Sequence, residues 1–461
     1  MYSVKEVMES RNMVVFGASR NPEKPGAVLL KLLRDTEFKG KVAGVNPQGG
    51  EIHGFHFYRK LDKVPFSVEL AVMLIPPQAV PVALKDCARK GVKGVVISSE
   101  GFAEVGAEGE QYQVEVRKIL RSSGMRGFGP NTLGLVNTAT GLTTSYIANE
   151  RTLKPGPIGF IAQSGIFVGG MLRYLSSFEG LQLSKGLGLG NKVDVDESDA
   201  LTYLMEDEAT RIIGMYLEDI REGPRFLEVA KKAALQKPIL LLKGGRTPLG
   251  ARSTASHTGS LAMDEAVVNG ALRQAGVLRM AGIDDLIGTL MGFRWMPLPK
   301  GGQIALVTYS GAQAIMSIDV ASELGLGLAG LQAKTHERLS RIISSVSKTR
   351  NPVDMFPDMI VHGFEKTTTK ILRALLEDDG VHGIVFISFA RPRAEDFLPH
   401  LEIIQKHNKK PVFFSLIGMK EDVESNRAFL EANGIPFYLF PEMAVRVFAC
   451  MWHHARRVPE I

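Results

Sequence analysis

The stretch Met13-Val14-Val15-Phe16-Gly17-Ala18-Ser19-Arg20-Asn21-Pro22 decides the fold of the first part of the chain, because an apolar strand runs directly into a glycine turn. Apolar runs recur at residues 42–45, 70–75 and 94–97, and helical stretches separate them. Short strands that alternate with helices are typical of a doubly wound parallel sheet. The first 137 residues are therefore predicted to form an α/β domain.

Two further series of apolar runs follow the first. The runs are residues 158–161, 183–189, 212–217 and 239–242 in one series, and residues 303–308, 383–387 and 411–414 in the other. A chain of 461 residues is too long for one core and suits three domains. We expect an α/β protein of three modules, with limits at 1–137, 138–297 and 298–461.

The composition argues against several classes of protein. The formal net charge is +6 and no basic run is interleaved with aromatic residues, so no nucleic-acid partner is expected. No apolar run reaches about 18 residues, and the N-terminus lacks the apolar core of a signal peptide. We expect a cytoplasmic protein that does not enter a membrane. Cys87 and Cys450 fall in different predicted modules, which argues against a disulfide.

One histidine lies in a distinctive chemical setting. Residues 243–262 surround His257 with glycines, hydroxyl groups and basic side chains, directly after the apolar run 238–242. Ligands bind at the carboxyl ends of strands in open α/β sheets. A nucleophilic imidazole needs one free nitrogen, a partner on the other nitrogen, and donors that hold phosphate oxygens. His257 is therefore a candidate for carrying a phosphoryl group; the alternative is a basic surface loop with an incidental histidine.

A carboxylate is predicted at the same edge of the sheet. Glu218 follows the strand 212–217, which is a neighbour in sequence of the strand that leads to His257. A carboxylate bonded to one imidazole nitrogen fixes the tautomer that leaves the other nitrogen free to attack. Glu218 is thus a candidate for orienting His257, and the alternative is an ordinary solvated acid at a strand end.

No metal site is expected. The acidic residues at 194–199 are typical of a helix N-terminus that is rich in carboxylates. The histidines at 53 and 56, and those at 453 and 454, lack the further ligands that a metal site needs.

The turn at residues 17–22 is suited to cradle a phosphate at a helix N-terminus. Its spacing is not that of the dinucleotide fingerprint, and the second strand runs into Val45-Asn46-Pro47 without the acid that binds a ribose. A nicotinamide-dependent oxidoreductase is therefore disfavoured. The turns at 75–77 and 98–102 also end strands of this module and project to the same edge.

Two Ser-Gly turns repeat one plan. Gln163-Ser164-Gly165 and Tyr309-Ser310-Gly311 each follow a strand and open a helix. The free N–H groups and positive dipole end of a helix start favour an anion. The shared plan suggests that the second and third modules are related.

With these motifs in order, nearly the whole chain resembles the alpha subunits of the NDP-forming acyl-CoA synthetases. It is more similar to those of ADP-forming acetyl-CoA synthetase than to that of succinyl-CoA synthetase. The matching segments are residues 17–22, 45–47, 100–101, 129–131, 163–165, 190–196, 256–260 and 351–354.

The resemblance implies a Rossmann-like CoA-binding domain followed by two flavodoxin-like ligase domains. It implies that His257 is phosphorylated, that Glu218 orients it, and that both Ser-Gly helix starts face the phosphohistidine. The implied CoA contacts are Gly17, Ala18, Ser19, Arg20, Val45, Asn46, Pro47, Pro76, Ser98, Ser99 and Glu100, and the implied phosphate contacts are Gln163, Ser164, Gly165, Ser310 and Gly311.

The family converts acyl-CoA and phosphate into acyl phosphate and CoA, moves the phosphoryl group to histidine, and then transfers it to ADP. That last step needs an ATP-grasp domain that binds ADP or ATP with Mg²⁺, and the three modules contain no convincing ATP-grasp segment. The resemblance therefore implies a separate beta subunit and a hetero-oligomer.

Two departures from the family's motifs leave a second interpretation of the function open. Gln48 stands where many relatives have a lysine near CoA, and Tyr309 stands where the third domain usually has an asparagine-led, more glycine-rich turn. The alternative is a CoA-binding regulatory or scaffold subunit that kept the fold without turnover. The intact segment around His257, together with Glu218, favours the enzyme. The acyl group and the physiological direction are not readable from these motifs.

Overall fold

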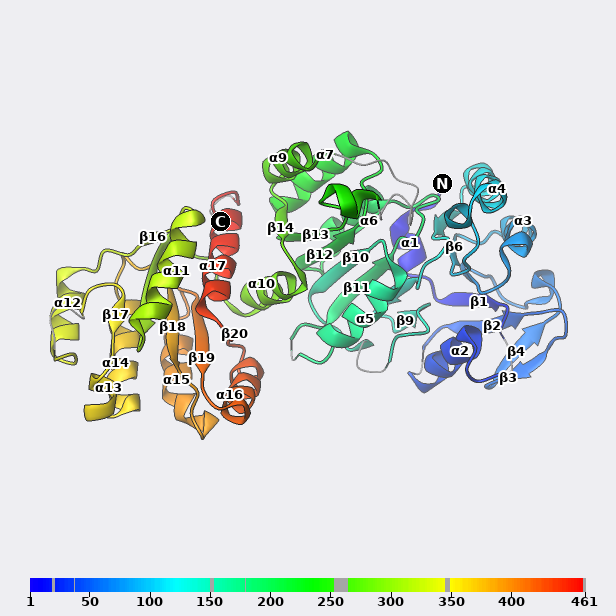
Figure 1. Ribbon diagram of the computed structural model, residues 1–461. Helices are drawn as coiled ribbons and strands as arrows, with labels where there is room; N and C mark the ends of the chain where they lie inside the picture. The colour runs from blue at the N-terminus through cyan, green and yellow to red at the C-terminus, as the bar shows by residue number, and fades with distance from the viewer. Residues whose placement is uncertain are drawn as a thin grey trace. The chain divides into compact units, whose positions relative to one another are not determined.

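A computed structural model describes residues 1–18, 21–36, 38–149, 153–178, 180–252, 264–344 and 349–458. The chain divides into two compact units, Met1–Met280 and Ala281–Ile461. The first unit contains two seven-stranded sheets and the second contains one six-stranded sheet. Figure 1 shows helices packed beside each of these sheets. The predicted α/β class with three parallel-dominated sheets is confirmed.

The first sheet has the strand order β3-β4-β2-β1-β5-β6-β7. Its neighbours are parallel except for the antiparallel pair β3 and β4. The strands are β1 (Asn12–Phe16), β2 (Lys41–Val45), β3 (Gly50–Ile52), β4 (Phe55–Tyr58), β5 (Leu70–Met73), β6 (Gly94–Ile97) and β7 (Arg126–Phe128). The helices of this region are α1 (Val4–Met8), α2 (Pro25–Asp35), α3 (Val80–Lys90) and α4 (Ala107–Ser123).

The direction of winding reverses between β1 and β5. The chain leaves β1 through α2 to reach β2 on one side, and it leaves β5 through α3 to reach β6 on the other side. Every residue of β5 and β6 is buried, as expected for parallel strands covered on both faces. A crevice outside the carboxyl ends of strands at such a reversal is the usual ligand site of this architecture.

The second sheet has the order β14-β13-β12-β10-β11-β8-β9. Strand β8 is antiparallel to both β11 and β9, and the other pairs are parallel. The strands are β8 (Leu135–Asn137), β9 (Leu142–Thr143), β10 (Ile158–Ala162), β11 (Leu183–Gly188), β12 (Ile212–Leu217), β13 (Ile239–Lys243) and β14 (Leu278–Met280). The helices are α5 (Gly165–Leu175), α6 (Glu197–Glu206), α7 (Gly223–Ala234) and α9 (Glu265–Ala275).

The third sheet has the order β16-β15-β18-β19-β20, with β17 paired to β15, and all its pairs are parallel. The strands are β15 (Gln303–Thr308), β16 (Gly327–Leu328), β17 (Val353–Asp354), β18 (Gly383–Phe389), β19 (Val412–Ile417) and β20 (Phe437–Tyr438). The helices are α10 (Ile283–Trp295), α11 (Gly311–Glu323), α12 (Ala333–Ser340), α13 (Asp358–Val361), α14 (Phe364–Leu376), α15 (Leu398–Lys406), α16 (Lys420–Ala432) and α17 (Pro441–Ala455).

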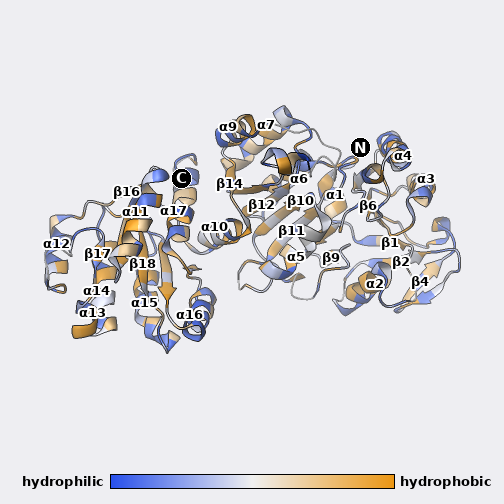
Figure 2. Cartoon of the chain, viewed as in Figure 1, coloured by the Kyte–Doolittle hydropathy of each residue, from blue (hydrophilic) through white to orange (hydrophobic). Residues whose placement is uncertain are grey.

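Helix α10 belongs to the second unit by its packing. The Tyr438 hydroxyl donates a 2.8 Å hydrogen bond to the Gly288 carbonyl, and a Cβ at Gly292 would lie 2.4 Å from a methyl group of Val447 on α17. Figure 2 shows hydrophobic residues along the central strands and hydrophilic residues on outer helices such as α16. Among the described residues, no helix combines the length and the apolar character that a membrane crossing requires. Cys87 and Cys450 are both free thiols.

Candidate functional site

A pocket of about 510 Å³ lies at the carboxyl ends of β1, β5 and β6, where the winding reverses. Five of the predicted CoA contacts line it, namely Gly17, Pro76, Ser98, Ser99 and Glu100. The remaining lining residues are Lys24, Pro25, Gly26, Leu74, Ile75, Pro77 and Tyr146. The structure thus brings the turns that end three strands together with the start of α2.

The turn after β1 needs glycine. Gly17 has a φ of +84°, and a Cβ there would lie 2.2 Å from the carbonyl oxygen of Leu74. A Cβ at Gly26, in the first turn of α2, would lie 2.7 Å from the Cα of Ala18. These close approaches set the strand end directly against a helix start, where the positive end of the helix dipole suits a phosphate. The predicted contacts Ser19 and Arg20 lie outside the described residues.

The loop after β2 uses its asparagine internally. The side-chain oxygen of Asn46 accepts hydrogen bonds from the backbone N–H groups of Gln48 at 3.0 Å and Gly49 at 2.6 Å. This arrangement is a local turn stabilised by an asparagine. Ala18, Val45, Asn46 and Pro47 are not among the residues that line the pocket.

The two serines after β6 differ in their hydrogen bonds. The Ser99 hydroxyl donates to the carbonyl oxygens of Ile75 and Met73, so it ties the end of β6 to the turn after β5. Within the described part of the chain, the buried hydroxyl of Ser98 has no hydrogen-bond partner. Buried hydroxyl groups normally have partners, so Ser98 is a group that a ligand in this pocket could bind.

The sequence analysis missed Tyr146, which lies between β9 and β10, far along the chain from the other lining residues. Burial raises the pKa of its phenol, and the nearby charge of Glu100 raises it further. No local motif marks this residue, because it reaches the pocket only through tertiary structure.

Glu218 is held at the carboxyl end of β12 by neighbours on two strands. The Gln163 side-chain oxygen accepts hydrogen bonds from the backbone N–H of Glu218 at 2.8 Å and of Asp219 at 3.1 Å. The Tyr216 hydroxyl donates to a carboxylate oxygen of Glu218 at 3.3 Å. Burial, with the charge of Glu218 and this bond, raises the pKa of Tyr216 to about 12, so the phenol keeps its proton.

Lys243, at the end of β13, binds the backbone next to the Glu218 carboxylate. It is 6% exposed, and its Nζ donates to the carbonyl oxygens of Glu218 and Gly244, at 2.6 Å each. Burial lowers the pKa of Lys243, and the charge of Arg279 lowers it further. Side chains from β13 and from the turn after β10 therefore position the backbone that carries the Glu218 carboxylate.

The turn after β10 opens helix α5. Ser164 occupies the N-cap position and Gly165 is the first helical residue. A Cβ at Gly165 would lie 3.2 Å from the backbone nitrogen of Leu133, so the helix start is tightly packed. His257 lies outside the described residues, and its distance from Glu218 is therefore not described.

The acidic residues at 194–199 cap a helix and form ion pairs. Asp196 caps α6 by accepting from the N–H groups of Ser198 at 2.9 Å and Asp199 at 3.0 Å. Arg126 forms ion pairs with Asp194 at 2.9 Å and with Asp199 at 2.6 Å. Among the described residues, no group of three or more histidine, cysteine or acidic side chains is placed to hold a metal ion.

A buried lysine lies beside this run. Lys192 forms ion pairs with Glu197, at 2.8 Å, and with Asp219, next to Glu218. Lys192 and Glu197 are 2% and 0% exposed, so both charges depend on each other for compensation.

Ser310 and Gly311 belong to the second unit, at the junction of β15 and α11. The Thr308 hydroxyl accepts from the N–H of Ser310 at 2.9 Å and donates to its carbonyl oxygen at 2.8 Å. The ring of Tyr309 packs on that of Phe389 with a centroid distance of 3.9 Å. An aromatic pair thus flanks this helix start.

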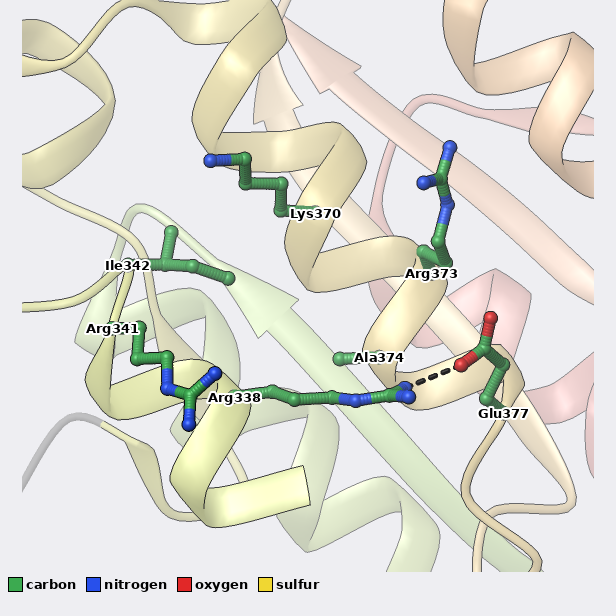
Figure 3. Close-up of a pocket in the computed structure, with 7 residues that line it drawn as sticks. All are labelled: Arg338, Arg341, Ile342, Lys370, Arg373, Ala374 and Glu377. Atoms are coloured by element: carbon green, nitrogen blue, oxygen red, sulfur yellow. Dashed lines mark hydrogen bonds and ion pairs between the residues drawn. The ribbon is translucent and has the colours of Figure 1, made fainter. Parts of the chain in front are cut away.

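A second pocket, of about 310 Å³, lies between α12 and α14 of the second unit (Figure 3). Arg338 forms an ion pair with Glu377 along its floor, and Figure 3 shows Lys370 and Arg373 pointing in different directions. None of the predicted site residues lines this pocket. Its cationic side chains do not converge on one point, so it is not the candidate site.

Comparisons with known proteins agree with this description. A family model described as a CoA binding domain matches residues 11–138, and one described as a succinyl-CoA ligase like flavodoxin domain matches residues 155–293. The chain is 35% identical to subunit alpha of acetate–CoA ligase [ADP-forming] II from Pyrococcus furiosus, covering 97% of each chain. It is also 35% identical to acetate–CoA ligase [ADP-forming] II from Archaeoglobus fulgidus, and it spans 67% of that longer relative.

The structure is similar to that of a dinucleotide forming acetyl-coenzyme A synthetase 1 from Ca. Korarchaeum cryptofilum, solved in complex with phosphate and ADP. The TM-score is 0.90 at 29% identity, covering 99% of this chain and 98% of that one. Fold and matches together define a CoA-binding domain joined to flavodoxin-like ligase domains. The chain belongs to the ADP-forming acyl-CoA ligase family, as the resemblance in its sequence predicted. The name of the Pyrococcus relative, a subunit alpha, implies a partner subunit for that protein.

Proposed function

We propose that this chain is the alpha subunit of an ADP-forming acyl-CoA ligase. It would interconvert acyl-CoA, ADP and phosphate with a carboxylic acid, CoA and ATP. The observation that carries the proposal is the position of Glu218 at the end of β12, next to β13, which leads into the His257 segment. Tyr216 bonds its carboxylate and Gln163 holds its backbone N–H. Such a carboxylate suits the task of holding one imidazole tautomer.

In this proposal CoA binds in the module 1–137 and the chemistry occurs in the module 138–297. The phosphates of CoA lie against the Gly17 turn and the start of α2, and Ser98 supplies a hydroxyl donor. A phosphate oxygen attacks the thioester carbonyl, the C–S bond breaks, and CoA leaves as its thiolate. The product is an acyl phosphate.

His257 then takes the phosphoryl group. Its free imidazole nitrogen attacks phosphorus, the bond between phosphorus and the acyl oxygen breaks, and the carboxylate leaves. Glu218 accepts the N–H of the other imidazole nitrogen and favours the cationic ring that forms. The helix start at Ser164 and Gly165 would stabilise the charge on the phosphoryl oxygens, and the helix start at Ser310 and Gly311 in the module 298–461 is proposed as a further phosphate contact.

The last transfer goes to ADP. We infer a separate ATP-grasp beta subunit that binds ADP or ATP with Mg²⁺, and hence a hetero-oligomer. This inference is supported by the length of the Archaeoglobus relative, of which this chain spans 67%. The proposal also places the protein in the cytoplasm, where these substrates are available.

The experiment is ATP formation from ADP, phosphate and a panel of acyl-CoA thioesters, with the chain mixed with a candidate ATP-grasp partner. Glu218→Gln keeps the side-chain size and removes the charge, so it is expected to reduce turnover at least tenfold, as loss of a charge-assisted hydrogen bond does. If CoA binds but no thioester supports ATP formation, the chain is a regulatory or scaffold subunit and the proposal that it is an enzyme is wrong. The Tyr309 and Phe389 pair at the start of α11 is the observation that favours that reading.

A further inference from the structure

Tyr146 enters the pocket of the first sheet from the second sheet's part of the chain. It follows β9 and precedes β10, whereas every other lining residue of the pocket lies at position 100 or earlier. Its side chain is half-buried and lies near Glu100. One wall of the pocket is therefore formed by a residue that lies outside the first sheet and its helices.

The backbone that carries Tyr146 is firmly anchored. Thr144 and Leu135 exchange two hydrogen bonds, one from the Thr144 N–H at 2.9 Å and one to the Thr144 hydroxyl oxygen at 2.8 Å. The N–H of Ser145 donates to the Thr143 hydroxyl oxygen at 3.1 Å. Thr144 and Ser145 are both buried. The aromatic ring is thus a preorganised wall, which lowers the entropic cost of binding against it.

The next residue connects this wall to the predicted phosphate site. Ile147 packs on helix α5, since a Cβ at Gly169 would lie 2.9 Å from the Cγ2 of Ile147. Helix α5 begins at Gly165, directly after Ser164. One short turn therefore places Tyr146 in the pocket and Ile147 on the helix whose first residues are predicted to bind phosphate.

The geometry gives CoA a direction. Its phosphates suit the Gly17 turn and the N-terminal end of α2, where Lys24 and Gly26 line the pocket and the positive end of the helix dipole favours an anion. Its thiol must reach the second sheet, because Glu218 and Ser164 lie there. The pantetheine arm then leaves the pocket on the side of Tyr146.

We propose that the ring of Tyr146 binds the pantetheine arm of CoA and directs the thioester end toward the start of α5. This inference rests on the proposed function and adds a specific binding residue to it. The arm is an uncharged chain with two amides, and a tyrosine offers it an apolar face and a hydroxyl donor. The raised pKa of the phenol keeps that donor protonated.

The test compares two ligands that share their phosphates and differ in the arm. Calorimetric titration of CoA and of adenosine 3′-phosphate 5′-diphosphate, which keeps all three phosphates and lacks the pantetheine arm, is carried out on the wild type, Tyr146→Ala and Tyr146→Phe. Tyr146→Ala is expected to bind CoA about tenfold more weakly, the loss of one aromatic contact, with unchanged affinity for the nucleotide that lacks the arm. Tyr146→Phe keeps the ring and is expected to stay within about threefold of the wild type for both ligands. Tyr112→Ala, on α4 and outside the pocket, is the matched control and is expected to change neither affinity.

Two results would overturn the inference: an unchanged CoA affinity in Tyr146→Ala, or an equal loss for both ligands, which would mean that the ring only maintains the pocket. If Tyr146→Ala loses its thermal transition, Tyr146→Leu fills the space without an aromatic face and takes its place, with the same expectation. A wild type that binds neither ligand would instead contradict the proposed function.

Discussion

The Tyr216 hydroxyl donates a hydrogen bond of 3.3 Å to the carboxylate of Glu218, two residues further along the chain. Tyr216 is on β12 and Glu218 directly follows the strand, so alternation along the strand brings both side chains to one side. The pKa of Tyr216, raised to about 12, keeps the donor protonated throughout the neutral range. The carboxylate is thereby oriented before any ligand arrives.

Tyr216→Phe should slow phosphorylation of the histidine about tenfold, because a hydrogen bond to a charged group contributes about 1.5 kcal/mol at this length. CoA affinity should not change, since Tyr216 does not line the CoA pocket. Single-turnover labelling measures the rate, and titration measures the affinity. Tyr203→Phe, a buried tyrosine on α6, is the control and should keep the wild-type rate.

Gly17→Ala should weaken CoA binding at least tenfold, because the new Cβ would meet the Leu74 carbonyl oxygen in a left-handed backbone conformation. Gly54→Ala provides the matched comparison. Gly54 has nearly the same φ, +83°, but a Cβ there meets nothing within 4 Å. Equal CoA affinities for the two variants would show that close packing at Gly17 is unimportant.

Lys192→Met should lower the free energy of unfolding by about 3–5 kcal/mol, because it leaves Glu197 buried without its partner. Lys232→Ala removes an exposed pair with Glu228 and should leave the free energy of unfolding nearly unchanged. Urea titration measures both. Similar small losses in the two variants would contradict the view that the buried pair is tightly coupled.

Acid should destabilise the second unit through its buried histidines. Burial lowers the pKa of His400 to about 4, and burial together with Arg457 lowers that of His454 to about 4, from an ordinary value of 6.5. The unfolded chain therefore binds more protons between pH 6.5 and pH 4, and stability falls as the pH is lowered through that range. His400 alone accounts for about 3 kcal/mol at full effect.

His400→Gln removes the titrating group and keeps a polar partner for the Thr368 hydroxyl, which lies 2.7 Å from the ring nitrogen. The pH dependence of the urea midpoint between pH 7 and pH 4.5 should therefore be flatter in this variant. The same slope as in the wild type would mean that His400 does not control the response.

Much of the fold follows from local sequence. The apolar runs at 13–16, 42–45 and 94–97 correspond to β1, β2 and β6, because strands buried on both faces leave an unbroken hydrophobic signal. The hairpin of β3 and β4 was missed, since its short, partly exposed strands carry no such run.

The candidate site was only partly predictable. The turn at Gly17 is visible in sequence because its positive φ favours glycine, and the turn at Ser98 is visible because it ends an apolar run. Tyr146 was missed because its place in the pocket beside Glu100 depends on how two sheets pack. The CoA contact of Asn46 stays a prediction, and its side-chain oxygen also stabilises its own turn.

The central claim is that His257 carries the phosphoryl group. Its most direct test is incorporation of acid-labile, base-stable labelled phosphate into the purified chain, mixed with acyl-CoA and labelled phosphate. We predict label on the wild type, none on His257→Ala, and slower labelling of Glu218→Gln. Label that persists in His257→Ala, or a wild type that binds CoA but takes up no label with any acyl-CoA, would contradict the account.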